Sequence, residues 1–287
     1  MAKKTYNRVT KDVGNIIALE HVNVTVPDQS LATYFYVNVM GFTRDPYMEW
    51  GPYNVWVNAG RQQFHLPTAK PQVLRGHIGV VVPDLQRLAS RLKQMSKRLT
   101  DTHFNYSIKK QHITVTCPWG NELRCYPPGK FGQMQLGIPY VELNVPTGSA
   151  TGIARFYEEI MDCRAILNGK SDRVDVQIGQ MQRLCFKESK KASPEYDGHH
   201  IAIYVSNFSG PHRKLDEAGR ITEESDDNQY RFQTIFDPKT NQSLFDLEHE
   251  VRSLHHPMYE RVLINRNDAQ SFFHYQKDRD AFTPAEQ

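Results

Sequence analysis

Cysteine is scarce in this chain of 287 residues, and its few thiols stand far apart in the sequence. Cys117, Cys125, Cys163 and Cys185 form no close-spaced pair of the kind that binds zinc or exchanges disulfides. We therefore expect buried free thiols and a reducing, cytoplasmic compartment. Residues 1–8 are polar and lack the apolar segment of a secretory signal, which agrees with that expectation.

Long apolar runs are also missing. No run approaches the roughly 20 residues that a membrane-spanning helix requires, so we expect a protein without a membrane partner. The formal net charge of +3 is spread along the chain and forms no basic stripe, which argues against a nucleic-acid partner. Nucleophile-elbow and phosphate-loop motifs are absent too. A hydrophobic content of 39% is enough for a packed core, and a small-molecule ligand remains the expected partner.

One strand-like pattern occurs four times in the chain. The stretches "LEHVNVTVPDQ" and "RGHIGVVVPDL" each place a histidine, His21 or His77, six residues before a Pro-Asp pair. Tyr140 in "IPYVELNVPTG" and His200 in "GHHIAIYVSNF" occupy the same position in two further copies. A repeat of this kind decides the architecture before local propensities are weighed.

Each copy continues in the same way, with a helical stretch and then three alternating strands. The predicted helices cover residues 31–40, 85–92, 153–161 and 210–219. Asp28 and Asp84 stand where a strand gives way to a helix and are suited to cap its free amide groups. Each unit is therefore strand, helix and three strands, and four units fit two domains of ordinary size.

Turn-forming residues at 127–130 separate the second unit from the third. We predict a first domain over residues 15–130, containing units one and two, and a second domain over residues 135–255, containing units three and four. The polar tail at 256–287 is expected to be an exposed arm or a contact with a partner subunit. Edge strands and this tail favour a homodimer.

Tandem modules with a histidine early in the first strand and a Gly-Asn turn before the last resemble the vicinal oxygen chelate superfamily. That superfamily includes glyoxalases, extradiol ring-cleaving dioxygenases and antibiotic resistance proteins, and the likeness covers about residues 17–253. It implies an α+β fold in which four βαβββ modules pair into two curved mixed sheets. Four modules in one chain are most similar to the two-domain extradiol dioxygenases, although one scaffold hosts several chemistries.

The resemblance also implies that metal ligands come from the first and fourth strands of each module. Counting 44 to 47 residues onward from each first-strand position locates the fourth-strand position. The corresponding positions are His21, His65, His77 and Arg124 in the first predicted domain, and Tyr140, Cys185, His200 and Asp246 in the second.

The first predicted quartet carries three histidines. A lone histidine in a sheet is usually a hydrogen-bonded core residue, but three at matched positions favour a metal site. We therefore predict His21, His65 and His77 as ligands of a divalent metal, iron(II) first, with Mn, Zn, Ni or Co as alternatives. Arg124 cannot ligate, because its guanidinium has no free lone pair. Either Glu122, one dyad step away, supplies the carboxylate, or Arg124 binds an anionic substrate.

The second predicted quartet is mixed. Tyr140 is no common ligand and Cys185 is expected to be a buried thiol, whereas His200 and Asp246 are of a metal-binding type. In the extradiol family the working metal lies in the C-terminal modules, held by two histidines and a glutamate. Two dyad-related glutamates could rebuild such a site with His200, namely Glu142 and Glu248. The more favoured interpretation is a degenerate cavity that supports the fold or binds substrate.

The leading hypothesis is a metal-dependent, extradiol-dioxygenase-like oxidoreductase that acts on a small oxygen-chelating substrate, such as a catechol. The metal would act as a Lewis acid on two adjacent substrate oxygens. The predicted substrate contacts are Glu122, Arg124, Tyr140, His200 and Asp246. Two alternatives remain open, a glyoxalase-type isomerase or lyase and a non-enzymatic ligand-binding protein of the resistance type.

Overall fold

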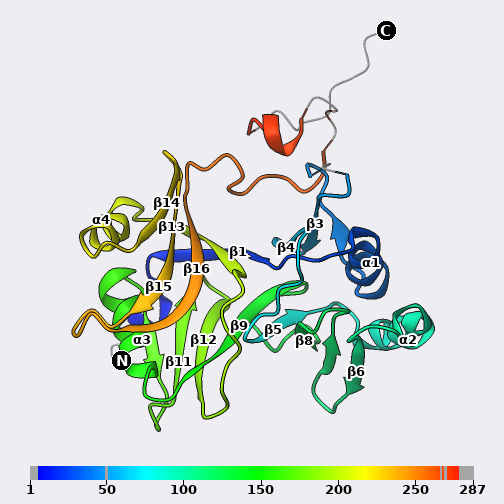
Figure 1. Cartoon of the computed structure of the whole chain (residues 1–287), viewed down its shortest axis with the longest axis horizontal. Helices are drawn as coiled ribbons and strands as arrows, with labels where there is room; N and C mark the ends of the chain where they lie inside the picture. The colour runs from blue at the N-terminus through cyan, green and yellow to red at the C-terminus, as the bar shows by residue number, and fades with distance from the viewer. Residues whose placement is uncertain (1–5, 49–50, 266, 268–269, 278–287) are drawn as a thin grey trace, which may run out of the picture.

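The computed structural model describes residues 6–48, 51–265, 267 and 270–277, and it contains two eight-stranded mixed sheets (Figure 1). The strands of the first sheet are β1 (Ile16–Asn23), β2 (Thr43–Arg44), β3 (Asn54–Ala59), β4 (Gln62–Pro67), β13 (His200–Val205), β14 (Ile221–Asp226), β15 (Gln229–Phe236) and β16 (Ser243–Ser253). The strands of the second are β5 (Gly76–Val81), β6 (Asn105–Ile108), β7 (Ile113–Thr116), β8 (Glu122–Tyr126), β9 (Gly137–Pro146), β10 (Ala165–Leu167), β11 (Arg173–Ile178) and β12 (Gln182–Ser189).

Four βαβββ modules build these sheets, so the predicted α+β fold is confirmed. The helical segments are α1 (Gln29–Thr33), α2 (Leu85–Met95), α3 (Ala150–Arg155), α4 (Ser209–Glu217), the π-helical turns Tyr34–Val39 and Phe156–Ile160, and the short 3₁₀ turns Val9–Lys11, Ser96–Leu99 and Phe272–His274. The predicted caps are also confirmed. The Asp28 carboxylate accepts a hydrogen bond from the backbone amide of Leu31, and the Asp84 carboxylate accepts hydrogen bonds from the backbone amides of Gln86 and Arg87.

The modules pair differently from the sequence prediction. The first sheet runs β14-β15-β16-β13-β1-β4-β3-β2 and joins the first module to the fourth, and the second runs β10-β11-β12-β9-β5-β8-β7-β6 and joins the second to the third. The joins are antiparallel contacts of β1 with β13 and of β5 with β9. Neither 15–130 nor 135–255 therefore holds a complete sheet. The repeat defines the strands of each module, but it carries no signal for which first strands meet.

Consecutive modules nevertheless pack through their helices. Arg91 on α2 donates to the carbonyls of Val39 and Met40, which connects the first two modules. Lys214 on α4 donates to the carbonyl of Glu159, which connects the last two. Figure 1 shows α1 beside α2 at one side of the molecule and α3 below α4 at the other. The division into two domains at residues 127–130 stays a prediction. The helices of each predicted domain pack on one another, whereas each sheet contains strands from both predicted domains.

The core is aromatic and aliphatic, as the composition requires. Fully buried rings include Phe35, Phe64, Phe156 and Phe186, which lie between the helices and the sheets. Burying an aromatic side chain removes a large apolar area from water and contributes about 2–3 kcal/mol for each ring. All four cysteines are free and buried, in agreement with the sequence prediction. Among the described helices, none combines the length and apolar character needed to cross a bilayer.

The C-terminal segment, defined here as residues 254–265, 267 and 270–277, is not simply an exposed arm. Met258 and Tyr275 are buried in a small cluster with Tyr47, Met48 and Trp56. A buried ion pair joins the guanidinium of Arg261 to the carboxylate of Asp45 at 2.5 Å, and its two side chains are 3% and 0% exposed. In this part of the chain the structure has an anchored segment in place of the predicted exposed arm, because apolar residues spaced through a polar segment pack on the first module. The predicted contact with a partner subunit stays a prediction.

Candidate functional site

The first sheet brings together one side chain from each of four strands, β1, β4, β13 and β16. The position two residues after His21 faces His65 across β1 and β4. The position two residues after His200 faces Glu250 across β13 and β16. His21 is thus structurally equivalent to His200, and His65 is equivalent to Glu250. The four residues are called the first-sheet quartet.

The second sheet repeats the same geometry with different residues. The position two residues after His77 faces Arg124 across β5 and β8, and the position two residues after Tyr140 faces Cys185 across β9 and β12. These four residues are called the second-sheet quartet. The identical offset in all four modules supports the positions that counting along the sequence gave for three of them.

The fourth module is the exception. Counting predicted Asp246, but the equivalent residue is Glu250, which follows His200 by 50 positions and not by 44 to 47. The extra residues lie in long β15 and β16 strands of 8 and 11 residues. Asp246 lies nearer the start of β16, where its carboxylate accepts the hydroxyl of Thr234 at 2.9 Å. The alternation in "LEHEV" marks Glu250 as a candidate, on the same strand face as Glu248.

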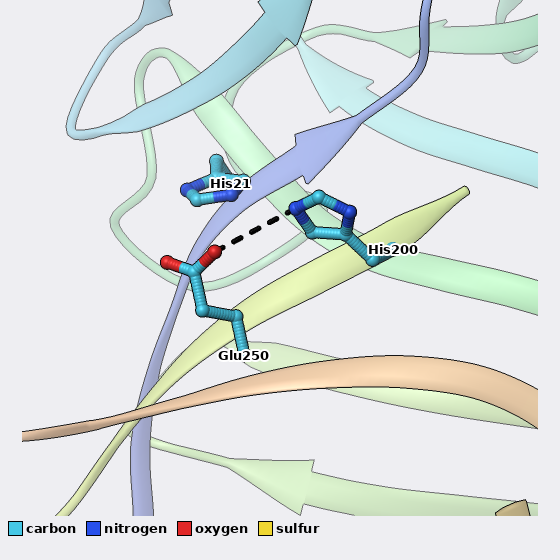
Figure 2. A group of neighbouring side chains, drawn as sticks. All are labelled: His21, His200 and Glu250. Atoms are coloured by element: carbon cyan, nitrogen blue, oxygen red, sulfur yellow. Dashed lines mark ion pairs between the residues drawn. The ribbon is translucent and has the colours of Figure 1, made fainter. Parts of the chain in front are cut away.

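His21, His200 and Glu250 form the group most suited to a metal ion (Figure 2). One ligand atom from each lies within 4.8 Å of the others, and all three residues come from different strands. The Nε2 atom of His200 lies 3.7 Å from Oε2 of Glu250. The Nε2 atom of His21 is buried and has no hydrogen-bond partner among the described residues, although an imidazole nitrogen in the interior normally has one.

His65 belongs to the quartet but lies outside this group. Its ring stacks on the His21 ring with centroids 3.6 Å apart, and the Trp56 ring stacks on its other face at 3.8 Å. Its Nε2 atom contacts Oε1 of Gln63 at 2.9 Å. Burial, and then the neighbouring His21, lower the pKa of His65 well below its usual value, so the ring is neutral. These contacts therefore fix the His65 ring against one face of the His21 ring.

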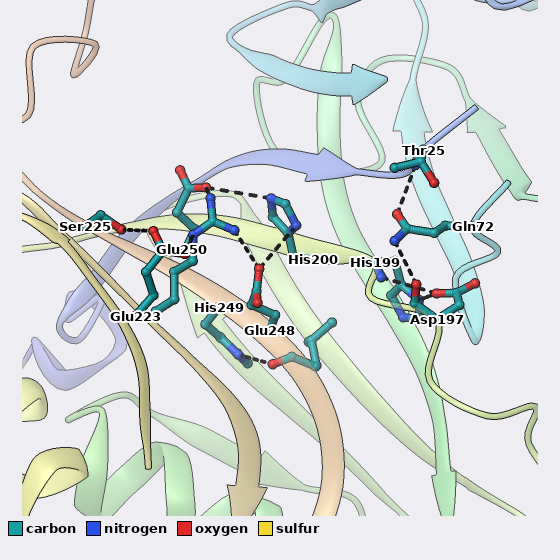
Figure 3. Close-up of polar contacts among 12 residues, drawn as sticks. Thr25, Gln72, Asp197, His199, His200, Glu223, Ser225, Glu248, His249 and Glu250 are labelled. Carbon is teal, nitrogen blue, oxygen red and sulfur yellow. Dashed lines mark hydrogen bonds and ion pairs between the residues drawn. The ribbon is translucent and has the colours of Figure 1, made fainter. Parts of the chain in front are cut away.

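Two arginines hold the carboxylate of Glu250. Arg252 contacts its Oε1 at 2.5 Å and Arg231 contacts its Oε2 at 2.5 Å, while Arg231 also binds Glu248 at 2.6 Å. Figure 3 shows His200 lying between Glu248 and Glu250. Burial raises the pKa of Glu250, but Arg252, followed by His21 and Arg231, lowers it to about 2. The group is thus a permanent carboxylate.

Neutral imidazole is the form of histidine that binds metals, and His200 has it. Burial, and then the neighbouring His21, lower the pKa of His200 to about 3. Two imidazoles and one carboxylate with open positions are a donor set that suits non-haem iron(II) and related divalent ions. The unpartnered Nε2 of His21 and the ionised Glu250 fit such an ion, although Glu250 would share its oxygens with the two arginines.

The second-sheet quartet has a different chemistry. The Nε2 atom of His77 contacts the hydroxyl of Tyr140 at 3.1 Å, and that hydroxyl lies 3.0 Å from the hydroxyl of Tyr126. The carboxylate of Glu142 lies 3.8 Å from Nδ1 of His77 and forms an ion pair with Arg173. Nε2 of His77 therefore has a hydrogen-bond partner in the Tyr140 hydroxyl, which Nε2 of His21 lacks among the described residues.

Arg124 and Cys185 complete this second quartet. Arg124 donates from Nε to Glu122 at 2.8 Å, so each of these residues neutralises the other. Burial raises the pKa of the Cys185 thiol far above its usual value, which keeps it protonated and a poor ligand. The Tyr140 ring lies over Gly79, where a Cβ would approach ring carbon Cε1 to 2.2 Å. Only glycine at position 79 leaves room for this ring.

The structure thus corrects the predicted metal triad. His21 and His65 lie together in the first sheet, but His77 lies in the second sheet among tyrosines and a glutamate. His200, predicted to contact substrate, joins the His21 group in its place. The prediction failed because it assumed that the first two modules share one sheet.

The other predicted substrate contacts lie apart from the His21 group. Glu122, Arg124 and Tyr140 belong to the second sheet, and Asp246 is outside the group on β16. Their role as substrate contacts stays a prediction. Sequence reasoning overlooked Glu250, and also Glu20, which precedes His21 directly in "LEHVN".

The C-terminal segment covers one side of the first-sheet quartet. Phe272 meets the Trp56 ring edge-on with centroids 4.7 Å apart, and Trp56 in turn stacks on His65. A continuous series of ring contacts therefore leads from Phe272 through Trp56 and His65 to His21. Tyr259 of the same segment packs on Tyr204 of β13, with the two ring centroids 4.9 Å apart. The segment thus touches both modules that contribute to the site.

Searches with family models and among curated proteins found no match to this chain. Solved structures do resemble it. A protein of Bacillus subtilis subsp. subtilis str. 168, described as a candidate dioxygenase, has a TM-score of 0.57 and 16% identity over 83% of this chain and 86% of its own. Glyoxalase I from Zea mays has a TM-score of 0.57 and 13% identity, covering 82% and 92%.

The cppA protein of Streptococcus pneumoniae TIGR4 is a third similar structure, with a TM-score of 0.50 and 11% identity over 84% of this chain and 99% of its own. Identities this low establish the fold alone. The chain has the vicinal oxygen chelate fold in its two-sheet, four-module form.

Proposed function

We propose that this protein is a divalent-metal-dependent enzyme of the vicinal oxygen chelate type, with His21, His200 and Glu250 as the ligands. The observation that carries the proposal is the convergence of two imidazoles and one carboxylate within 4.8 Å, with the Nε2 of His21 buried and lacking a hydrogen-bond partner among the described residues. A bound divalent ion would supply Lewis-acid activation of two adjacent substrate oxygens. We favour iron(II) and a catechol-like substrate, because a two-histidine, one-carboxylate set is typical of iron(II) oxygenases.

The surrounding residues support this chemistry. Arg231 and Arg252 keep Glu250 ionised, and burial keeps His200 neutral, so both have the protonation state that a ligand needs. Trp56 and His65 form a buried aromatic stack next to His21, which closes that side of the site.

A glyoxalase-type isomerase is the second candidate, favoured by one observation. His65 occupies the quartet position equivalent to Glu250, so a rotation of its ring would offer a fourth protein ligand. The stacking of His65 between Trp56 and His21 and its contact with Gln63 oppose that rotation. Three protein ligands favour the dioxygenase, and four would favour the isomerase.

Metal titration followed by an activity panel tests the proposal. Metal-depleted protein is dialysed anaerobically against Fe(II), Mn(II), Co(II), Ni(II) and Zn(II), and bound metal is counted by elemental analysis. We expect one ion per chain, and oxygen consumption with catechols after iron loading. One ion with turnover of a hemithioacetal, and no oxygen consumption, would assign the isomerase. Failure of every metal to bind at stoichiometric level would overturn both assignments.

A further inference from the structure

Strand β1 contains an irregularity immediately before His21. Leu19 pairs with Ile203 on β13, and His21 pairs with Ala202, so two steps along β1 match a single step along β13. Glu20 is the extra residue of a β-bulge. In a regular strand neighbouring side chains point to opposite faces, whereas a bulge can bring an extra side chain to the face of its neighbour.

The bulge places the Glu20 carboxylate on the ring of His21. Oε2 of Glu20 lies 2.9 Å from Nδ1 of His21, and both side chains are buried, at 10% and 1% exposure. A carboxylate can only accept a hydrogen bond, so Nδ1 must be the donor. In the neutral ring the lone pair then resides on Nε2, which is buried and has no hydrogen-bond partner among the described residues.

Further contacts hold Glu20 in place. The guanidinium of Arg252 binds Glu20 through Nη1 and Glu250 through Nη2, so one side chain bridges the two carboxylates. The hydroxyl of Tyr204 donates to Oε1 of Glu20 at 3.2 Å. Arg252 is itself only 6% exposed, and its Nε donates to Gln229 at 2.9 Å. The carboxylate therefore has one defined position.

We propose that Glu20 is the positioning residue of the first-sheet site, and that its bulge exists to fix the tautomer and orientation of His21. The inference rests on the proposed function, because it gives Glu20 the role of positioning His21, a proposed metal ligand. Through Arg252 the same network orients the Glu250 carboxylate, so His21 and Glu250 are set by one connected group of side chains. Partners of this kind, hydrogen-bonded to a ligand histidine, commonly change metal affinity 10- to 100-fold when they are removed.

The test compares Glu20→Ala, which removes the acceptor, with Glu20→Gln, which keeps an acceptor oxygen but loses the charge. Tyr204→Phe is the matched control, because it removes one hydrogen bond to Glu20 and leaves the contact between Glu20 and His21. The first readout is the tautomer of His21 in metal-free protein, from correlation of ring nitrogen and carbon-bound proton NMR signals, assigned by their loss in His21→Gln. The second is the affinity for Co(II), followed by its visible absorption.

We expect one Nδ1–H tautomer of His21 in the wild type and in Tyr204→Phe, and a mixture of tautomers in Glu20→Ala. Co(II) affinity should fall about 10- to 100-fold in Glu20→Ala and less in Glu20→Gln. A purely structural role would lower the melting temperature of the variants but leave tautomer and affinity unchanged, which would overturn the proposal. If Glu20→Ala does not fold, the isosteric Glu20→Gln decides by the same two readouts.

The tautomer measurement also separates this inference from the proposed function. If wild-type protein binds no Co(II) while His21 shows a single tautomer that depends on Glu20, the metal assignment fails and the positioning role stands. If metal binds and the tautomer is independent of Glu20, the positioning role fails alone.

Discussion

The two sheets have the same strand arrangement but surround their first-strand histidines, His21 and His77, with different polar groups. In the first sheet, the ring of His21 has a buried nitrogen without a hydrogen-bond partner among the described residues, and charged partners surround the site. In the second sheet, the ring of His77 is satisfied by Tyr140 and lies near Glu142. A histidine at an equivalent strand position is therefore no evidence for a metal. The two sites differ in whether residues on the neighbouring strands donate to or accept from Nε2 of the histidine.

The difference arises from single positions in equivalent strands. Where the first sheet has Glu250, the second has Arg124 or Cys185. Where the first has His200 on the strand paired with that of His21, the second has Tyr140 on the strand paired with that of His77, and the Tyr140 ring lies over Gly79. The guanidinium of Arg124 has no free lone pair and the thiol of Cys185 stays protonated, so neither offers a metal the ligand that Glu250 offers. The two sheets thus share a backbone arrangement and differ in the side chains at its equivalent positions.

The largest expected effect is the loss of metal binding when a first-sheet ligand is removed. His200→Ala should weaken metal binding by at least about 1,000-fold, or about 4 kcal/mol, since a direct ligand contributes more than its hydrogen-bonded partners. His77→Ala is the matched change in the second sheet and should retain one ion per chain. Equilibrium dialysis with elemental analysis measures both. If His77→Ala loses the ion and His200→Ala keeps it, the comparison between the two sheets is reversed.

A second expected effect concerns the cover of the first site. Arg261→Met should lower the free energy of unfolding by about 3 kcal/mol, because it leaves the buried carboxylate of Asp45 without its cation. Arg173→Met removes a partner of Glu142 near the second-sheet quartet and should cost about 1–2 kcal/mol, because Arg173 is 29% exposed. Urea unfolding measures both values. Equal losses in the two variants would contradict the prediction.

The smallest expected effect is a pH dependence contributed by the second sheet. Burial, opposed in part by Glu142, lowers the pKa of His77 to about 4 from an unfolded value near 6.5. The unfolded chain therefore takes up the proton first, and stability falls as the pH drops from 6.5 towards 4. Between pH 7 and pH 5, metal-free wild type should lose about 1–2 kcal/mol more than His77→Gln in urea unfolding. Equal losses in the wild type and His77→Gln would contradict the prediction.

Much of the fold followed from the sequence because it depends on local and periodic signals. The alternation around His21 and His200, the four helices and the Asp28 and Asp84 caps each arise within a few residues of one another. The site depended on information that the repeat does not hold. Which first strands pair is decided by long-range packing, so His77 was assigned to the wrong sheet.

Glu250 and Glu20 show two further limits. Counting by a fixed spacing fails where strands lengthen, as β15 and β16 do, and the predicted Asp246 falls four positions short of Glu250. A bulge overrides the rule that adjacent side chains face opposite ways, so Glu20 looked unconnected to His21. Both departures from regularity lie at the site itself, which agrees with the general tendency of functional positions to break local patterns.

Strand β1 lies between β4 and β13 in the first sheet (Figure 1). During synthesis its β4 neighbour is made within about 45 residues, whereas its β13 neighbour appears only after residue 200, and Glu250 later still. The nascent chain therefore carries an unpaired hydrogen-bonding edge on β1 through most of translation, an edge of the kind that invites mispairing. The first-sheet quartet is consequently completed last, after the other sheet already has all of its strands.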